Sequence, residues 1–188
     1  AGAPCHIHSV NGGQGLNTGL ADAFNLIWKL KIDKEHPGTI DLSSYEAERK
    51  PVAESVIKVS GDLVRTTKFA ETNSHAKQYL KLVEAYSGNI TGMGITYPGE
   101  GLIGHRLHDM TIKTSTGQKR LYSLLDYQSH SLISFGDKAT PPNLPKGTKV
   151  IRINANDGPT SYSTENQTYP NQQLLIRPDG YIAQTWND

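Results

Sequence analysis

Residues 5–30 read CHIHSVNGGQGLNTGLADAFNLIWKL, a turn rich in glycine and asparagine that runs directly into a helical pattern. Gly12, Gly13 and Gly15 can adopt backbone conformations that are closed to other residues, and they allow a ligand to approach the main chain. From position 16 onward, apolar residues recur at helical spacing. This pattern predicts a helix that starts near Gly15 and packs an apolar stripe on a core. The stripe consists of Leu16, Leu20, Ala23, Phe24, Ile27 and Leu30.

The expected start of this helix is also a candidate binding site. The first N–H groups of a helix have no acceptor within the helix, and they lie at the positive end of its dipole. Beside a glycine turn, they favour an anion or a polarised carbonyl. The candidate cofactor-binding residues are Gly12, Gly13, Gln14, Gly15, Leu16 and Asn17.

Four segments of the chain carry a resemblance to a known family. Residues 12–19 read GGQGLNTG, residues 22–30 read DAFNLIWKL, residues 44–53 read SYEAERKPVA and residues 175–183 read LIRPDGYIA. They resemble segments of the FAD-dependent aromatic hydroxylases, the phenol-hydroxylase-like flavoprotein monooxygenases, in which the first is the second FAD-contacting motif. The resemblance extends over nearly all of the chain, and it implies the C-terminal portion of such an enzyme.

Helical patterns dominate residues 1–88, which resemble a remnant of the family's FAD-binding domain. The segment 43–46 predicts a capping box that opens a second helix, and Pro51 suits the first turn of a third helix. A fourth helix is expected around residues 74–86, with Gly88 as its C-terminal stop.

From residue 89 the composition changes to glycine, proline, threonine and short β-prone runs. Residues 89–188 resemble the family's C-terminal thioredoxin-like domain, which lacks a C-x-x-C pair, as this chain does. The expected elements are a short helix at 123–125, strands at 130–135 and 149–154, and a hairpin of 173–176 with 181–185. The predicted fold class is therefore α/β (α+β), a helical segment followed by a thioredoxin-like domain.

The resemblance leaves out most of the family's flavin site. Family members begin with a strand, a G-x-G-x-x-G turn and a helix that hold the ADP half of FAD, and the 188 residues contain no such pattern. Ala3 stands where the family has an aspartate that contacts FAD, and Pro4 removes a backbone donor. We therefore expect a truncated relative that binds no cofactor, with FAD as the alternative.

Composition excludes several other classes. Lys and Arg number 19 against 18 Asp and Glu, and no basic run occurs, so nucleic acid is not an expected partner. No apolar run approaches the roughly 18 residues of a membrane span, and no signal-peptide pattern is visible, so the cytoplasm is expected. The single cysteine, Cys5, excludes a disulfide within the chain.

Histidines near the glycine turn are the candidate acid–base groups. A neutral imidazole near pH 7 can both give and take a proton. The candidate catalytic residues are His6, His8 and Asn11. His105 and His108 lie near Asp109, but no H-E-x-x-H or paired C-x-x-C spacing occurs, so no metal site is predicted.

These observations lead to one hypothesis and two alternatives. The hypothesis is an enzyme of secondary metabolism that acts without redox chemistry on a hydrophobic aromatic or polyketide-like small molecule, by cyclisation, isomerisation or a pericyclic step. The first alternative is part of an FAD-dependent aromatic monooxygenase completed by a missing N-terminal part. The second is a non-catalytic small-molecule-binding or dimerisation module. Because the family covers the apolar helix faces with its FAD domain, we also expect a homodimer, a partner protein or a hydrophobic ligand pocket.

Overall fold

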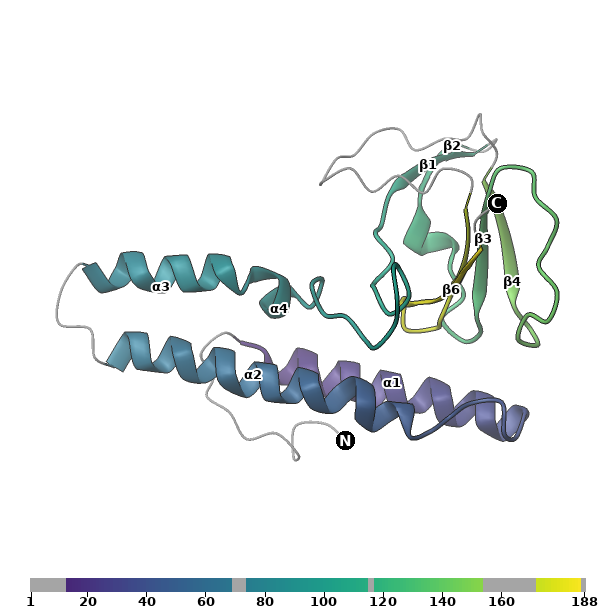
Figure 1. Ribbon diagram of the computed structural model, residues 1–188. Coiled ribbons are helices and arrows are strands. Elements are labelled where there is room, and N and C mark those ends of the chain that lie inside the picture. The colour runs from purple at the N-terminus through teal and green to yellow at the C-terminus, as the bar shows by residue number, and fades with distance from the viewer. Residues whose placement is uncertain (1–12, 69–73, 115–116, 154–171, 187–188) are drawn as a thin grey trace. The chain divides into compact units, whose positions relative to one another are not determined.

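The computed structural model describes residues 13–68, 74–114, 117–153 and 172–186 (Figure 1). The chain divides into two compact units, Ala1–Pro98 and Gly99–Asp188. This division falls later than the change of composition at residue 89, because the segment after that point still contacts the helices. The Tyr97 hydroxyl, for example, accepts a hydrogen bond from Arg49 Nη1 at 3.0 Å.

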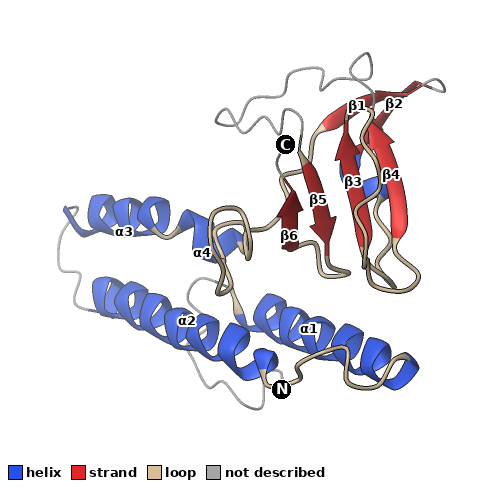
Figure 2. Cartoon of the chain, turned by 45° about the vertical axis from the view of Figure 1, so that its right-hand side comes forward, coloured by secondary structure: helices blue, strands red, loops and turns tan. Residues whose placement is uncertain are grey.

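The first unit is helical. Its elements are α1 (Gly15–Glu35), α2 (Ser44–Lys68), α3 (Ser74–Ala85) and the short α4 (Ser87–Thr91). α2 packs against both α1 and α3, and two views of the chain show it alongside each of them (Figures 1 and 2). The apolar side chains that are buried in α2 are Val52, Ala53, Val56, Val59 and Leu63.

α2 continues through Pro51, where the sequence predicted a boundary between two helices. A proline inside a helix provides no N–H to the carbonyl four residues earlier, and it costs about 3 kcal/mol. The residues on both sides hold the helix together: Glu48 and Arg49 bind α1 just before the proline, and Val52 and Val56 are buried just after it. Tertiary contacts thus override the local break, and the prediction of two helices was wrong.

The start of α2 also differs from the predicted capping box. The Ser43 hydroxyl donates to Asp41 Oδ1 at 2.7 Å, and Glu46 pairs with Lys50 at 3.3 Å. The backbone N–H of Ser43 also donates to the Asp41 carboxylate. The pKa of Asp41 is lowered, mainly by the bond from the Ser43 hydroxyl and next by the bond from the Ser43 N–H. The Glu46 N–H donates to the Ser43 backbone carbonyl at 3.1 Å rather than to the Ser43 hydroxyl, and the Glu46 carboxylate pairs with Lys50, so both groups of the predicted box have other partners.

Gly88 does not end the fourth predicted helix. α3 is followed by α4, and Gly92, with φ 75°, is the left-handed C-cap. Gly88 instead meets Gly94, whose N–H donates to the Gly88 carbonyl at 2.9 Å. A Cβ on Gly94 would lie 2.9 Å from the Gly88 Cα, so the two backbones touch where a side chain has no room.

In its described residues, the second unit contains two sheets. Its elements are β1 (Thr111–Thr114), β2 (Gly117–Arg120), the 3-10 helix η2 (Leu121–Leu124), β3 (Ser131–Phe135), β4 (Lys149–Ile153), β5 (Gln173–Ile176) and β6 (Ile182–Trp186). The larger sheet has the order β4-β3-β5-β6, in which β3 and β4 are parallel and the other two pairs are antiparallel. This mixed sheet is compatible with the thioredoxin-like domain that the resemblance implies. Its predicted strands are confirmed, whereas the separate hairpin β1–β2 was not predicted.

An apolar core holds the second unit together. β3 is buried along its whole length, so its side chains are covered on both faces of the sheet. The turn between β5 and β6 is the predicted one, with the Gly180 N–H donating to the Arg177 carbonyl at 2.9 Å. The core cluster comprises Leu107, Met110, Ile112, Leu121, Leu125, Ile133, Phe135, Ile151, Ile153, Leu174, Ile176 and Ile182.

Candidate functional site

α1 begins at the glycine turn, as the sequence predicted. Gln14 is the N-cap residue, and the first helical hydrogen bond runs from the Thr18 N–H to the Gln14 carbonyl at 2.8 Å. The N–H groups of Gly15, Leu16 and Asn17 precede this bond, so they have no acceptor within the helix. Among the described residues, the first turn of α1 contains no acidic side chain and Gln14 makes no side-chain cap bond, so neither offsets the positive end of the helix dipole.

Gly13 and Gln14 give the turn its shape. Gly13 has φ 63°, in the left-handed region, and no atom of the residues that the structure describes lies within 4 Å of the position that a Cβ would take. Gln14 is only 3% exposed, and its Oε1 has no hydrogen-bond partner among the described residues. A buried polar atom without a partner costs about 1–3 kcal/mol, so the described part of this turn is not fully satisfied by hydrogen bonds of its own.

Several predicted site residues cannot be placed against this turn. His6, His8 and Asn11, the candidate catalytic residues, lie outside the described residues, as does Gly12. Their roles stay predictions from the sequence.

α1 turns its apolar stripe away from the other helices, contrary to the sequence prediction. Leu16 is 74% exposed, and Leu20 and Ile27 are each 60% exposed. Phe24 and Leu30 are exposed as well. Helical spacing establishes that these residues share one face, but it does not establish which neighbour covers that face. The prediction that the stripe packs on a core was therefore wrong for the described part of the chain, whereas the exposed stripe agrees with the expectation that these helix faces need a covering partner or ligand.

The buried face of α1 is mainly polar. It consists of Thr18, Asp22, Asn25, Trp28, Lys29 and Ile32. Buried polar and charged side chains are costly unless they are paired. α2 supplies their partners in two neighbouring clusters.

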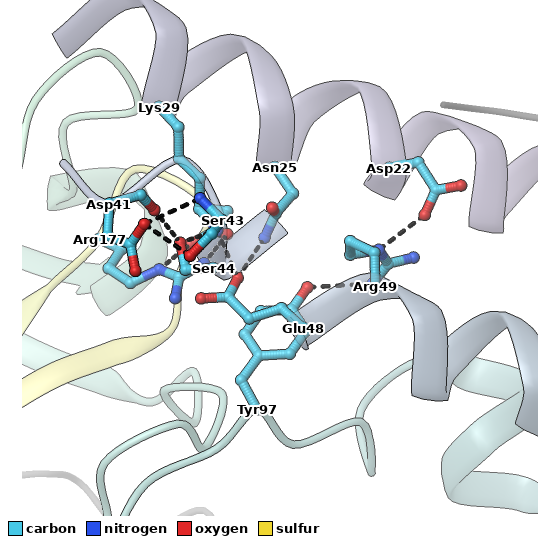
Figure 3. Close-up of polar contacts among 11 residues, drawn as sticks. Asp22, Asn25, Lys29, Asp41, Ser43, Ser44, Glu48, Arg49, Tyr97 and Arg177 are labelled. Carbon is cyan, nitrogen blue, oxygen red and sulfur yellow. Dashed lines mark hydrogen bonds and ion pairs between the residues drawn. The ribbon is translucent and has the colours of Figure 1, made fainter. Parts of the chain in front are cut away.

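The Arg49 cluster consists of Arg49, Asp22 and Tyr97, which Figure 3 shows, and of the Thr18 carbonyl. Arg49 Nε donates to Asp22 Oδ1 at 2.7 Å, and Nη1 donates to the Tyr97 hydroxyl at 3.0 Å. Nη2 makes a longer contact of 3.5 Å with the Thr18 carbonyl. Burial alone lowers the pKa of Arg49, but its contacts with Tyr97 and Asp22 outweigh burial and raise the pKa above its ordinary value.

The Lys29 cluster lies further along α1 and consists of Lys29, Asn25, Glu48 and Ser44 (Figure 3). Glu48 Oε2 accepts from Asn25 Nδ2 at 2.7 Å and from Lys29 Nζ at 3.0 Å. Lys29 Nζ also donates to the Ser44 hydroxyl at 2.8 Å. Lys29 is 1% exposed, so this ammonium group depends on its partners in α1 and α2.

Sequence reasoning missed both clusters, although a signal was present. Asp22, Asn25 and Lys29 recur at helical spacing opposite the apolar stripe, and Glu48 and Arg49 bring both charge signs to α2. The polar face of an amphipathic helix is ordinarily exposed to solvent, so the sequence pattern does not indicate that these residues are buried.

The acidic group near the histidines of the second unit has a structural role. Asp109 Oδ2 accepts from Arg120 Nη2 at 2.7 Å, and its Oδ1 accepts from the Tyr122 N–H at 3.1 Å. Among the described residues, no group of three or more His, Cys, Asp or Glu side chains is arranged to hold a metal ion.

His130 is a buried titratable group that the sequence did not single out. It is 5% exposed and directly precedes β3. Burial and the Arg177 charge lower the pKa of His130 to about 4, although Asp179 opposes the shift. The imidazole is therefore neutral near pH 7.

Two protein families match the chain. Residues 1–60 match the FAD binding domain family, and residues 100–188 match the aromatic-ring hydroxylase C-terminal family. The chain belongs to the FAD-dependent aromatic-ring hydroxylases. One hydroxylase relative is the uncharacterized aromatic compound monooxygenase YhjG of Bacillus subtilis, 32% identical over 97% of this chain and 38% of the relative. Another is the rifampicin monooxygenase of Streptomyces venezuelae, 37% identical over 100% of this chain and 39% of the relative. The chain thus spans a little over a third of these hydroxylases.

Solved structures of hydroxylases agree with this assignment. The anhydrotetracycline hydroxylase OxyS from Streptomyces rimosus has a TM-score of 0.71 and 28% identity, over 100% of this chain and 40% of OxyS. The aromatic hydroxylase CabE has a TM-score of 0.72 at 21% identity, over 95% of this chain and 39% of CabE, and it supports the fold alone. The predicted mixed α/β class is confirmed.

The expectation that the chain binds no cofactor was wrong. The FAD binding domain family matches residues 1–60, which include the glycine turn, and this match overturns the expectation. The described part of the turn fits such a cofactor, because it has an open backbone at Gly13 and a buried acceptor on Gln14.

No helix in the described part of the chain combines the length and apolar content needed to cross a membrane.

Proposed function

We propose that this chain provides the second FAD-contacting segment and the C-terminal domain of an FAD-dependent aromatic monooxygenase. The observation that carries this proposal is the start of α1, where N–H groups without helical acceptors adjoin a left-handed glycine and a buried amide oxygen. FAD, when bound, supplies the redox chemistry for inserting an oxygen atom into the substrate. The non-redox cyclase hypothesis has less support than this alternative, because the curated relatives named above are monooxygenases.

The residues of the turn have distinct tasks in this proposal. The N–H groups of Leu16 and Asn17 bind a carbonyl or anionic group of the cofactor, helped by the helix dipole. Gly13 lets the backbone take its left-handed form and leaves space above it for the cofactor. The Gln14 amide oxygen accepts a hydrogen bond from the ligand. His6, His8 and Asn11 are proposed as the groups that move protons to and from the substrate.

A hydrophobic aromatic or polyketide-like compound is the proposed substrate class. Two relatives are named for anhydrotetracycline and rifampicin, which are large organic molecules of this kind. The apolar stripe of α1 supports an assembly larger than the helical unit, since a continuous exposed face of Leu, Phe and Ile side chains favours a covering partner. We propose that the remainder of an FAD domain provides this cover.

A direct test is to measure FAD binding by the purified chain and by a chimera. In the chimera, this chain replaces the matching C-terminal part of the Bacillus subtilis monooxygenase YhjG. We expect the chimera to retain FAD, seen as flavin absorbance after gel filtration, and to consume oxygen when an aromatic substrate is added. A folded chimera that retains no flavin, together with a chain that binds none, would contradict the proposal.

Two glycines provide a matched pair for the same measurement. Gly13 and Gly38 both have positive φ, 63° and 76°, and both have open space where a Cβ would lie. An alanine at either position brings a similar backbone strain, of about 1 kcal/mol. We expect Gly13→Ala to weaken FAD binding and Gly38→Ala to leave it unchanged. Equal effects of the two variants would mean that strain, not contact with the cofactor, is responsible.

A further inference from the structure

The Arg49 cluster contacts the same end of α1 that presents the cofactor-binding N–H groups. Arg49 reaches the Asp22 carboxylate at 2.7 Å and the Thr18 carbonyl at 3.5 Å, two positions that are one helical turn apart. The Thr18 N–H in turn donates to the carbonyl of the N-cap residue, Gln14, at 2.8 Å. One helical hydrogen bond therefore links Thr18, which Arg49 contacts, to the N-cap of the helix, four residues earlier in the sequence.

The guanidinium group of Arg49, in α2, makes three contacts with two other segments of the helical unit. Nε donates to Asp22 in α1, and Nη1 donates to Tyr97 in the segment after α4. Nη2 contacts the backbone carbonyl of Thr18 in α1. Arg49 is 3% exposed and Asp22 is fully buried, so water does not screen the pair. A planar guanidinium with five donors suits this geometry, whereas a lysine ammonium group is a compact point charge that cannot reach all three acceptors.

The Lys29 cluster offers an internal comparison. It joins the same two helices, and it is also buried, with Glu48 next to Arg49 in the sequence. Its contacts on α1 are made at Asn25 and Lys29, beyond the first turns of the helix. Both clusters stabilise the α1–α2 pair, but only the Arg49 cluster reaches the backbone beside the N-cap.

We propose that Arg49 is a positioning residue for the FAD-binding turn, holding the first turn of α1 in the orientation that presents its free N–H groups to the cofactor. The identity of the ligand rests on the proposed function above. The effect of Arg49 on the first turn of α1 concerns this chain alone, and it can be measured without any cofactor.

Hydrogen exchange of the chain without FAD tests that effect. The variants are Arg49→Lys, which keeps the charge, and Tyr97→Phe, which removes one acceptor and preserves packing. Glu48→Gln is the matched control, because it removes a buried charge from the neighbouring cluster. We expect amide exchange at residues 18–20 to rise about tenfold in Arg49→Lys, as for the loss of a hydrogen bond to a charged group, and less in Tyr97→Phe. In Glu48→Gln the rise should be confined to residues around Asn25 and Lys29.

FAD titration of the chain and of the YhjG chimera completes the test. We expect Arg49→Lys to raise the Kd for FAD about tenfold, while Glu48→Gln changes it by less than about twofold. A merely structural role predicts that all variants change exchange and affinity in proportion to their loss of stability, and that result would overturn the inference. Unchanged exchange at residues 18–20 in both Arg49→Lys and Tyr97→Phe would also overturn it. If the exchange contrast is seen but no protein binds FAD, the proposed function fails and the positioning of the turn by Arg49 stands.

Discussion

The core cluster of the sheet unit and the contact between α1 and α2 bury different kinds of side chain. The core cluster of the sheet unit is apolar, and Ile133, Leu174 and Ile176 within it are fully buried. In the helical unit the contact between α1 and α2 buries Asp22 and Lys29, while a stripe of large apolar side chains on α1 faces outward. The sheet unit thus contains the core that its own strands require. The polar face of α1 pairs its buried charges with partners on α2. Its apolar face is not covered by the described residues of the helical unit, so the sequence of α1 is suited to a larger assembly.

Breaking the charged contact should have the largest effect on the helical unit. Arg49→Met leaves the Asp22 carboxylate buried without its guanidinium partner, which costs about 3–5 kcal/mol of unfolding free energy. The double variant Asp22→Leu with Arg49→Met should recover most of this loss, because apolar side chains of similar volume need no pairing. Denaturation followed by Trp28 fluorescence, in a Trp186→Phe background, reports on the helical unit alone. A double variant as unstable as the single one would contradict this account.

Replacing a leucine by alanine should have the next largest effect, and this effect should differ between the two units. Leu174→Ala in the centre of the sheet core removes a fully buried side chain, at a cost of about 2–5 kcal/mol. Leu20→Ala on the α1 stripe, where the side chain is 60% exposed, should change the unfolding free energy by less than about 0.5 kcal/mol. Each variant is measured by denaturation with the tryptophan of its own unit. Similar losses for the two leucines would show that the stripe is packed in solution.

Acid should weaken the sheet unit through His130. The pKa of His130 is about 4 in the folded protein and about 6.5 in the unfolded chain, so between these values only the unfolded chain binds the proton. The unfolding free energy should therefore fall as the pH drops from 6.5 to 4, by up to about 3 kcal/mol. His130→Asn should lack this part of the pH dependence. Denaturation followed by Trp186 fluorescence, in a Trp28→Phe background, measures it.

The smallest effect on stability is expected on the outer face of α1. Leu20→Gln combined with Ile27→Gln should change the unfolding free energy by less than about 0.5 kcal/mol, since both side chains are largely exposed. The same change should reduce any self-association seen by light scattering, and it should weaken FAD retention by the YhjG chimera. A double variant that assembles as well as the original chain would show that the stripe has no covering partner.

The comparison also explains which parts of the fold the sequence could reveal. The strands of the sheet unit were found because Leu132 to Phe135 and Leu174 to Ile176 form short apolar runs beside clear turn signals, as buried strands do. The hairpin β1–β2 was missed because its second strand, GQKR, carries polar side chains that are all exposed. The prediction of a helix boundary at Pro51 was wrong because helix preferences of single residues do not include tertiary contacts. Here Arg49 binds Asp22 of α1, and Val52 is buried.

The candidate site was predictable only in part. The start of α1 at Gly15 followed from the glycine turn and the onset of helical spacing. The partners of Asp22 and Lys29 depend on how α2 approaches α1, and the sequence does not encode this approach in any local pattern. A charged residue on the polar side of a helix has the same appearance whether it meets water or a buried counter-ion.

The contact between Gly88 and Gly94 limits how the connection between the helices and the second unit can evolve. Two main chains approach each other there with no space between them, and the Gly94 N–H closes the contact by bonding to the Gly88 carbonyl. Neither position can accept even a methyl group unless the other backbone moves. A substitution at either glycine therefore requires a compensating shift of the backbone at the other, so the two positions are constrained together.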